Sequence, residues 1–261
     1  MARKTLSCVE LEEIESLISK GVSLNDMAKI LDRSKTTIYY HFRKIRGKTI
    51  SPVEVRLKDD VLLGEFIGLF AGDGSYYKMP NYKYTIRLHF NKTEDNYVRL
   101  LIDQVLVHLF GKPPMIFQQE NRINLCYYSK NIYSLILDFL KWNSNEPKTY
   151  SVGLRTFNHS RNFYIGFVRG SVDSDGHISP KSISFATVSP ELKCSIEFAL
   201  TSLEFDFRTH LYKEKRMNRR DIYHISLFSK DFERFHDVVG PRNLQGLKMH
   251  RPGFEFPNAS P

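Results

Sequence analysis

Three short runs of apolar residues at helical spacing lie within residues 9–46 and predict three helices. The second run follows Ser23, a predicted N-cap with Asp26 three residues on, and the third run follows Ser34. The predicted packing between these helices uses the apolar residues on their facing sides, namely Met27, Ala28, Leu31, Ile38 and Phe42.

The other side of the third predicted helix is polar and basic. It carries Lys35, Thr36, Thr37, Tyr39, Tyr40, Arg43 and Lys44. The pattern resembles a helix-turn-helix, with small Ala28 where two helices cross and the third helix placed to enter a major groove. Asp32 stands where the turn usually has glycine, and aspartate tolerates the left-handed backbone. A plain three-helix bundle with a solvated basic face is the alternative, but patterning and charge together favour DNA binding.

From residue 61 onward the pattern describes two related halves, each reading αββαββα. The first half predicts helices at 61–73, 94–109 and 130–141, with strands at 75–79, 83–91, 114–118 and 122–128. The second half predicts helices at 162–175, 190–203 and 230–239, with strands at 177–179, 182–188, 207–215 and 221–228. The boundaries divide the chain into residues 1–47, a linker at 48–60, and two subdomains at 61–150 and 151–261.

Apolar and polar residues alternate along the predicted strands, as in antiparallel sheets with one face on helices. In residues 83–91, Ile86 and Leu88 lie on one side, and Arg87 and His89 on the other. Two such sheets side by side would form a basic concave surface for DNA, although an ordinary solvent-exposed face is the alternative for any single residue. The candidate DNA contacts on the polar faces are Lys83, Arg87, His89, Gln118, Arg122, Asn124, His210, Lys215, Arg219 and His224.

The composition supports an anionic partner. The 261 residues carry a formal net charge of +9 and are 41% hydrophobic, enough for a sizeable core. The chain has no apolar run of roughly 18 residues and no signal-peptide pattern at its start, so we expect no membrane partner. Three widely spaced cysteines indicate a reduced compartment. We expect an intracellular protein, cytoplasmic and nucleoid-associated or organellar.

Two of the predicted helices carry glycine stripes. Glycine recurs every four residues at Gly64, Gly68 and Gly72, and the second half has Gly166, Gly170 and then Ser174. Glycine inside a helix costs about 1 kcal/mol relative to alanine, so the stripes indicate close contact between two helix backbones. Packing the stripes together brings Asp73 and Asp175, the acids that end the helices, close to each other.

Two carboxylates at helix C-termini repel each other and the partial negative charge there. A divalent cation relieves both effects, and Mg²⁺ is commonly held by one or two carboxylates together with phosphate oxygens. Beneath a basic groove, the pair therefore suggests metal-assisted phosphodiester hydrolysis. Each Asp-Gly alone is more often an ordinary helix stop, but their duplication on matched glycine stripes favours the site.

The segments "IGLFAGDGS" and "VRGSVDSDG" resemble the two motifs of the LAGLIDADG endonucleases, and the αββαββα halves are similar to that family's repeated subdomain. The second motif departs at Arg169 and Ser171. The resemblance covers about residues 61–250 and implies an α+β fold with duplicated subdomains and saddle-shaped antiparallel sheets. Two motifs in one chain imply the monomeric type, which recognises a long asymmetric duplex site.

The resemblance also implies residue roles. Asp73 and Asp175 would bind Mg²⁺ or Mn²⁺, and the carbonyls of Gly72 and Ser174 are candidates to complete the coordination. A catalytic lysine in each half maps by position to Lys148 and Lys248, with Arg242 competing in the second half; a solvated surface charge is the alternative for each. Asp173 is expected to hydrogen-bond near its helix end without binding metal. His177 is expected on a sheet face.

The leading hypothesis is a site-specific, homing-type DNA endonuclease that cuts across the minor groove and leaves 3′ overhangs, with the helix-turn-helix extending its DNA contacts. A non-catalytic transcriptional regulator is the first alternative, because related folds with helix-turn-helix modules serve in that role. An RNA-binding intron maturase is the second, although the sequence has no RNA-specific signature.

Overall fold

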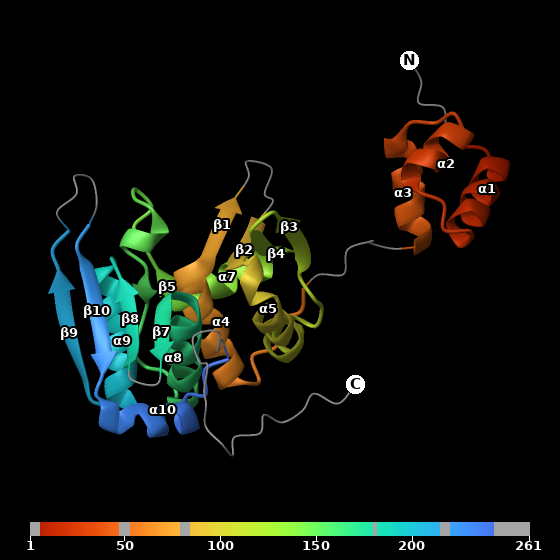
Figure 1. Ribbon diagram of the computed structural model, residues 1–261. Coiled ribbons are helices and arrows are strands. Elements are labelled where there is room, and N and C mark those ends of the chain that lie inside the picture. Colours follow the sequence, from red (N-terminus) through yellow and green to blue (C-terminus); the bar gives the residue numbers. More distant parts are fainter. Residues whose placement is uncertain (1–5, 47–52, 79–83, 180–181, 215–219, 243–261) are drawn as a thin grey trace. The chain divides into compact units, whose positions relative to one another are not determined.

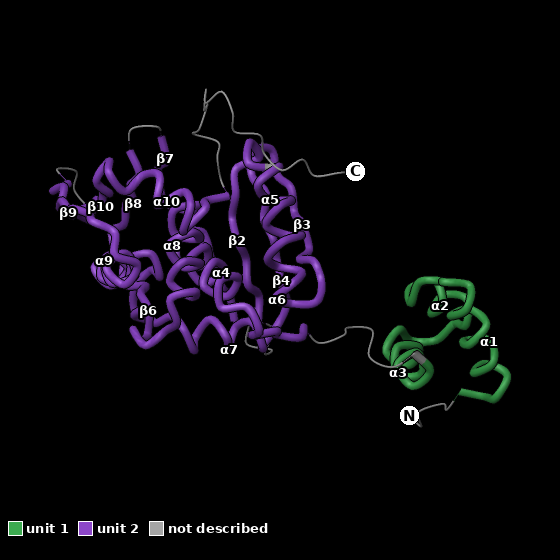
Figure 2. The backbone as a smooth tube through the Cα atoms, turned by 90° about the horizontal axis from the view of Figure 1, so that it is seen from below, with its two compact units in different colours: residues 1–52 green, residues 53–261 purple. Residues whose placement is uncertain are grey.

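The computed structural model describes residues 6–46, 53–78, 84–179, 182–214 and 220–242. The chain forms two compact units, Met1–Pro52 and Val53–Pro261 (Figure 2). Each unit has its own hydrophobic core.

The smaller unit consists of α1 (Cys8–Ser19), α2 (Leu24–Ile30) and α3 (Lys35–Arg46). The predicted N-caps are confirmed, since Ser23 accepts from the backbone N–H of Asp26 and Ser34 from that of Thr37. The core predicted for this unit is also confirmed, and two residues of α1 complete it. Its fully or largely buried members are Ile14, Ile18, Met27, Ile38 and Phe42.

The turn between α2 and α3 has the left-handed backbone expected there. Asp32 has φ +46°, a conformation that aspartate adopts more readily than most side chains. The next residue, Arg33, donates from Nε to Glu10 of α1 at 2.8 Å. This ion pair fastens the turn to the first helix and lowers the pKa of Glu10 to about 2, chiefly through the Arg33 hydrogen bond.

The larger unit repeats one pattern of elements, as the sequence predicted. The first half contains α4 (Asp60–Asp73), β1 (Gly74–Lys78), β2 (Tyr84–Asn91), α5 (Asp95–Leu101), a π-helical turn (Ile102–Leu106), α6 (Val107–Phe110), β3 (Met115–Gln119), β4 (Arg122–Tyr128) and α7 (Lys130–Phe139). The second half contains α8 (Arg161–Asp175), β7 (Gly176–Ser179), β8 (Ser182–Thr187), α9 (Pro190–Ser202), β9 (Phe207–Tyr212), β10 (Ile222–Leu227) and α10 (Phe232–Val238).

Each half builds a four-stranded antiparallel sheet of the same topology. The strand orders are β1-β2-β4-β3 and β7-β8-β10-β9. In each half, two hairpins are therefore joined side by side, through β2 and β4 in the first sheet and through β8 and β10 in the second. The two sheets lie on either side of the central helices α4 and α8 (Figure 1). The predicted α+β class with a duplicated subdomain is thus confirmed.

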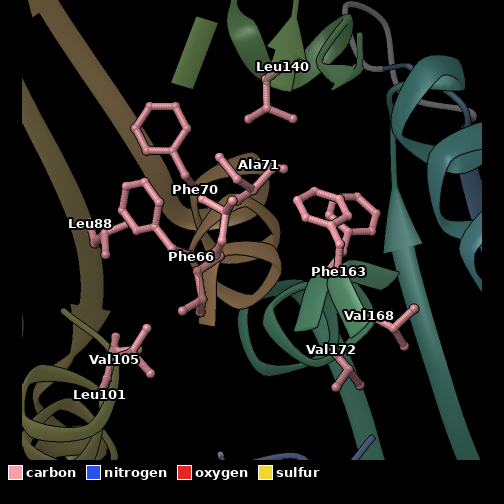
Figure 3. Close-up of a cluster of buried hydrophobic side chains, with 14 of the residues drawn as sticks. Phe66, Phe70, Ala71, Leu88, Leu101, Val105, Leu140, Phe163, Val168 and Val172 are labelled. Carbon is pink, nitrogen blue, oxygen red and sulfur yellow. The ribbon is translucent and has the colours of Figure 1, made fainter. Parts of the chain in front are cut away.

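Helices α4 and α8 pack directly against each other along their glycines (Figures 1 and 2). A Cβ on Gly64 would overlap the carbonyl oxygen of Phe163, and one on Gly166 would overlap that of Val61. Any larger residue would therefore push the two helix backbones apart. The flanks of the pair carry large apolar side chains such as Phe66, Phe70 and Phe163, which fill the surrounding core (Figure 3).

Three features differ from the expected pattern. The helix expected at 94–109 is interrupted by the π-helical turn, which inserts an extra residue per turn. Residues 140–141 and 153–154 form an additional short pair, β5 and β6. Within the expected linker, Val53 is buried in the larger core and the Arg56 N–H donates to the Leu109 carbonyl. In the part of the chain that the structure describes, no helix is sufficiently long and apolar to span a bilayer.

Candidate active site and DNA-binding surfaces

The two acids of the motifs end the two central helices. Asp73 is the last residue of α4 and Asp175 the last residue of α8, and each is followed by a glycine that starts the first strand of its sheet. A Cβ on Gly72 would lie 2.7 Å from Asp175 Oδ2. The carboxylate of α8 therefore lies against the last turn of α4, as the glycine stripes predicted.

The electrostatics identify the two carboxylates as a pair. Burial, and then the charges of Asp175 and Glu94, raise the pKa of Asp73 to about 7. The pKa of Asp175 is also raised by desolvation, although this residue keeps part of its surface exposed. Around neutral pH a bare pair thus holds its negative charge at a cost in free energy. Glu94, which contributes to that cost, was not predicted from the sequence.

Lys148 lies beside the pair, in the short 3₁₀ turn Lys148–Tyr150. Its Nζ donates to the carbonyl oxygens of Phe70 at 2.6 Å, Ala71 at 2.7 Å and Gly72 at 3.4 Å. Desolvation lowers the pKa of Lys148 to about 8, while the charges of the two aspartates oppose this shift. The ammonium group caps the C-terminal end of α4 and lies within the field of both carboxylates.

The donors gathered here fit a hard divalent cation. They are two carboxylate groups, together with carbonyl oxygens in the last turns of α4 and α8, and Mg²⁺ prefers such oxygen ligands while retaining several waters. Among the described residues there is no cluster of three or more His, Cys, Asp or Glu side chains that would form a complete protein cage. A cation held here would keep open positions for water and phosphate oxygens.

Arg242 does not take the position of a second catalytic lysine. Its Nε donates to Glu65 at 2.6 Å, its guanidinium also contacts Gln104, and its backbone N–H donates to Asp173 at 3.1 Å. Asp173 hydrogen-bonds near its helix end, as expected. Glu65 is fully buried and also pairs with Arg169 at 3.1 Å. This network joins the two halves behind the site, and the sequence did not reveal it.

The register of the first sheet defines its outer, polar face. His89 pairs with Asn124 and Arg87 with Cys126, while Leu88 pairs with Leu125 on the buried face. Directly paired residues point to the same side of a sheet. Arg87, His89, Arg122 and Asn124 therefore share the outer face, as predicted.

The placement of Gln118 on that polar face is wrong. Gln118 pairs with Ile123, whose side chain is buried on the inner face, and Phe117 pairs with Asn124. The strand MIFQQ has three apolar residues in succession, so its sequence does not show which side faces outward. The outer positions of β3 are Met115, Phe117 and Gln119.

The second sheet presents different side chains at the matching positions. His224 pairs with His210 on β9 and with Ala186 on β8. His177 is exposed and pairs with Ser184. His210, Tyr212 and His224 form a cluster of rings on this face.

The outward side of α3 has the expected composition. Lys35, Thr36, Tyr39, Tyr40 and Arg43 are exposed, and the hydroxyl of Thr37 lies 2.8 Å from that of Ser34. Arg43 lies over the Tyr39 ring and Lys44 over the Tyr40 ring. Four candidate residues, Lys83, Lys215, Arg219 and Lys248, lie outside the described residues.

Comparison with known families supports both units. Residues 2–44 match the family described as a helix-turn-helix domain, and residues 162–240 match that of a LAGLIDADG-like domain. The resemblance noted from the two motifs is thus confirmed, with a LAGLIDADG-like domain in the second half. No curated protein matches the chain significantly.

Solved structures share the fold. A crystal structure of I-DmoI in complex with DNA and Mn matches with a TM-score of 0.53 and 17% identity, over 69% of this chain and 96% of that one. A structure of mesophilic variants of the homing endonuclease I-DmoI matches with a TM-score of 0.50 and 18% identity, over 69% and 90%. At this identity, the likeness establishes the fold.

Proposed function

We propose that this protein is a metal-dependent, site-specific endonuclease that cuts both strands of duplex DNA. The observation that carries the proposal is the pairing of Asp73 and Asp175 at the adjoining ends of α4 and α8, with Lys148 beside them. A regulator that only binds DNA gains nothing from two repelling, desolvated carboxylates, whereas a nuclease needs them. The structural likeness to I-DmoI, which is bound to DNA and Mn in its crystal structure, is consistent with this chemistry.

The residues of the pair have distinct tasks in the proposed reaction. Asp73 and Asp175 would hold the cation and orient the water molecules around it. Mg²⁺ or Mn²⁺, when bound there, would supply Lewis-acid chemistry that polarises the phosphodiester and lowers the pKa of the attacking water. Lys148 keeps the last turn of α4 in place through the Phe70 and Ala71 carbonyls, and its charge stabilises the negative charge that develops on the phosphate.

The outer sheet faces supply the proposed recognition surface. β-strands can read base edges in a major groove, and phosphate contacts by arginine and lysine would make the affinity fall with salt. The two outer faces differ at their central strands. His89 and Asn124 pair across β2 and β4 in the first sheet, and Ala186 and His224 pair across β8 and β10 in the second. A duplex read by both faces would therefore have two unlike half-sites. By the family resemblance, cleavage occurs across the minor groove with 3′ overhangs, by a monomer.

The experiment uses a randomised duplex library. Purified protein is incubated with the library and Mg²⁺ or Mn²⁺, and the cut ends are sequenced, in parallel with an Asp73→Asn/Asp175→Asn double variant. Metal-dependent cuts at one long sequence with 3′ overhangs, absent with the double variant, would support the proposal. If neither protein cuts and both bind the same duplex equally, the protein is a DNA-binding regulator and the endonuclease proposal fails.

A further inference from the structure

Three polar side chains on the outer face of the first sheet form a continuous hydrogen-bonded chain. Ser75 of β1 lies with its Oγ 2.7 Å from Nε2 of His89 on β2. The other ring nitrogen, Nδ1, lies 2.6 Å from the carboxamide oxygen Oδ1 of Asn124 on β4. Strand pairing holds this arrangement in place, because His89 and Asn124 are direct partners.

The chemistry of the three groups fixes the direction of donation. A carboxamide oxygen can only accept, so Nδ1 of His89 carries the proton. In the neutral ring Nε2 is then an acceptor, and it takes the proton of the Ser75 hydroxyl. Donation therefore runs from Ser75 through His89 to Asn124. The carboxamide oxygen of Asn124 is turned toward the histidine, and its amide group keeps two N–H donors for a ligand.

The surroundings of Asn124 add donors to this position. Arg122 and Arg87 are exposed on the same face, and a guanidinium group can only donate. Asn124 itself is half-buried, next to Phe117 across the strand pair. A ligand that fits this position therefore offers hydrogen-bond acceptors, as the edges of some bases do.

In the major groove, guanine offers two acceptors, N7 and O6, and thymine offers O4. Adenine keeps the N7 acceptor but has an amino donor where guanine has O6, and cytosine has an amino donor where thymine has O4. The usual bidentate contact of asparagine with adenine needs the carboxamide oxygen and N–H side by side at the base edge. Here the oxygen is turned toward His89, so that contact is lost.

We propose that Ser75, His89 and Asn124 form a specificity-determining relay, in which Asn124 donates to a guanine or thymine edge and discriminates against adenine and cytosine. The inference rests on the proposed function, since it assigns a base preference to the DNA-reading face. Ser75 and His89 act as positioning residues, because they orient the carboxamide without touching the base. The corresponding positions of the second sheet hold His177, Ala186 and His224, and the alanine has no polar side-chain group, so the relay belongs to one half-site.

The first test concerns the free protein and needs no DNA. Long-range ¹⁵N NMR distinguishes a protonated ring nitrogen from an unprotonated one. We expect His89 to carry its proton on Nδ1, with Nε2 unprotonated, at a pH where the ring is neutral. The reverse tautomer would overturn the relay whatever the protein does with DNA.

The second test measures sequence preference by binding selection from the randomised duplex library, without divalent cation. Asn124→Ala identifies the position read by Asn124, as the one whose preference is lost. We expect wild type to favour guanine or thymine there by about 10-fold or more. Ser75→Ala frees the ring to take the other tautomer and turn the carboxamide oxygen outward, which shifts the preference toward adenine or cytosine. Ser75→Thr, which keeps the hydroxyl, retains the wild-type preference.

The outcomes separate the two proposals. Selective binding with adenine or cytosine preferred at the Asn124 position overturns the relay and leaves the proposed function standing. A Ser75→Ala protein that keeps the wild-type preference overturns it equally. If wild type enriches no sequence at all, the proposed function fails and the relay fails with it.

Discussion

Lys148 donates from Nζ to the carbonyl oxygen of Phe70 at 2.6 Å, across 78 positions of sequence. The contact joins the turn after the first half's last helix to the end of the helix that carries Asp73. A single ammonium group thus caps a helix C-terminus and offsets the charge of two carboxylates.

Replacing this lysine tests whether the charge serves catalysis. We expect Lys148→Met to reduce the cleavage rate by about 100-fold or more, because the variant loses charge stabilisation in the transition state. DNA affinity should change only a few-fold. Single-turnover cleavage and equilibrium binding would be measured side by side. Lys130→Met, at an exposed lysine on α7, is the control; equal losses in both variants would argue against a special role for Lys148.

The raised pKa of Asp73 predicts a stability change that depends on pH. The carboxyl has a pKa of about 7 in the folded protein and an ordinary value of 3.8, so the folded state binds more protons between these values. The contribution of Asp73 to the free energy of unfolding therefore falls as pH rises from about 4 to 7. Asp73→Asn removes this penalty, and we expect it to raise the free energy of unfolding by about 2 kcal/mol at pH 8 without metal.

The gain from Asp73→Asn should nearly disappear near pH 4, where the carboxyl is protonated in the folded state and about half protonated in the unfolded state. Urea denaturation at the two pH values measures it, with Asp103→Asn at an exposed position as the control. If Asp73→Asn instead lowered the free energy of unfolding at pH 8, the ionised carboxylate would not be destabilising the folded state.

The helix contact predicts an intolerance of side chains at its glycines. A Cβ on Gly170 would overlap the Glu65 carbonyl oxygen and lie 2.7 Å from the Leu69 nitrogen. We expect Gly170→Ala to lower the free energy of unfolding by about 3 kcal/mol or more, since backbone must move. The neighbouring Ser171 has a buried hydroxyl with no hydrogen-bond partner among the described residues, so Ser171→Ala should cost nothing or stabilise. Equal changes in the free energy of unfolding for Gly170→Ala and Ser171→Ala would contradict the close packing of α8 against α4 at Gly170.

Most of the fold could be predicted from the sequence, because the apolar residues and glycines of both halves recur at helix or strand spacing. Glycines four apart, together with a terminal acid, predicted the contact of α4 with α8 and the proximity of Asp73 and Asp175. Alternation predicted the outer face of β2 and β4. The same reasoning failed at Gln118, since β3 is an edge strand with consecutive apolar residues and only its pairing with β4 decides which side faces outward.

Side-chain contacts between residues far apart in the sequence could not be predicted from the pattern of apolar and polar positions. The buried carboxylate of Glu65 meets Arg169 and Arg242, which are 104 and 177 positions away. Nothing local distinguishes these arginines from solvated ones, because their pairing follows from the packing of the two halves. The polarity of the Ser75, His89 and Asn124 chain likewise appears only when three strands are in register.

The smaller unit offers a prediction about salt. Arg43 is exposed on the outward side of α3 and is expected to contact a phosphate. Arg43→Ala should weaken binding to all duplexes alike and reduce the slope of log affinity against log salt by about 1. Lys20→Ala, at the exposed end of α1, is the matched control and should leave the slope unchanged. Binding titrations over a range of salt concentrations measure it, and an unchanged slope for Arg43→Ala would remove α3 from the interface.

The central claim is that Asp73 and Asp175 form one catalytic centre, and strand-resolved cleavage tests it most directly. The selected duplex is labelled on each strand and incubated in Mg²⁺ with wild type, Asp73→Asn or Asp175→Asn. If the carboxylates act together, each single variant loses cleavage of both strands by at least about 100-fold while still binding the duplex. Retention of double-strand cleavage by either variant, or loss of only one strand in each, would contradict a shared centre.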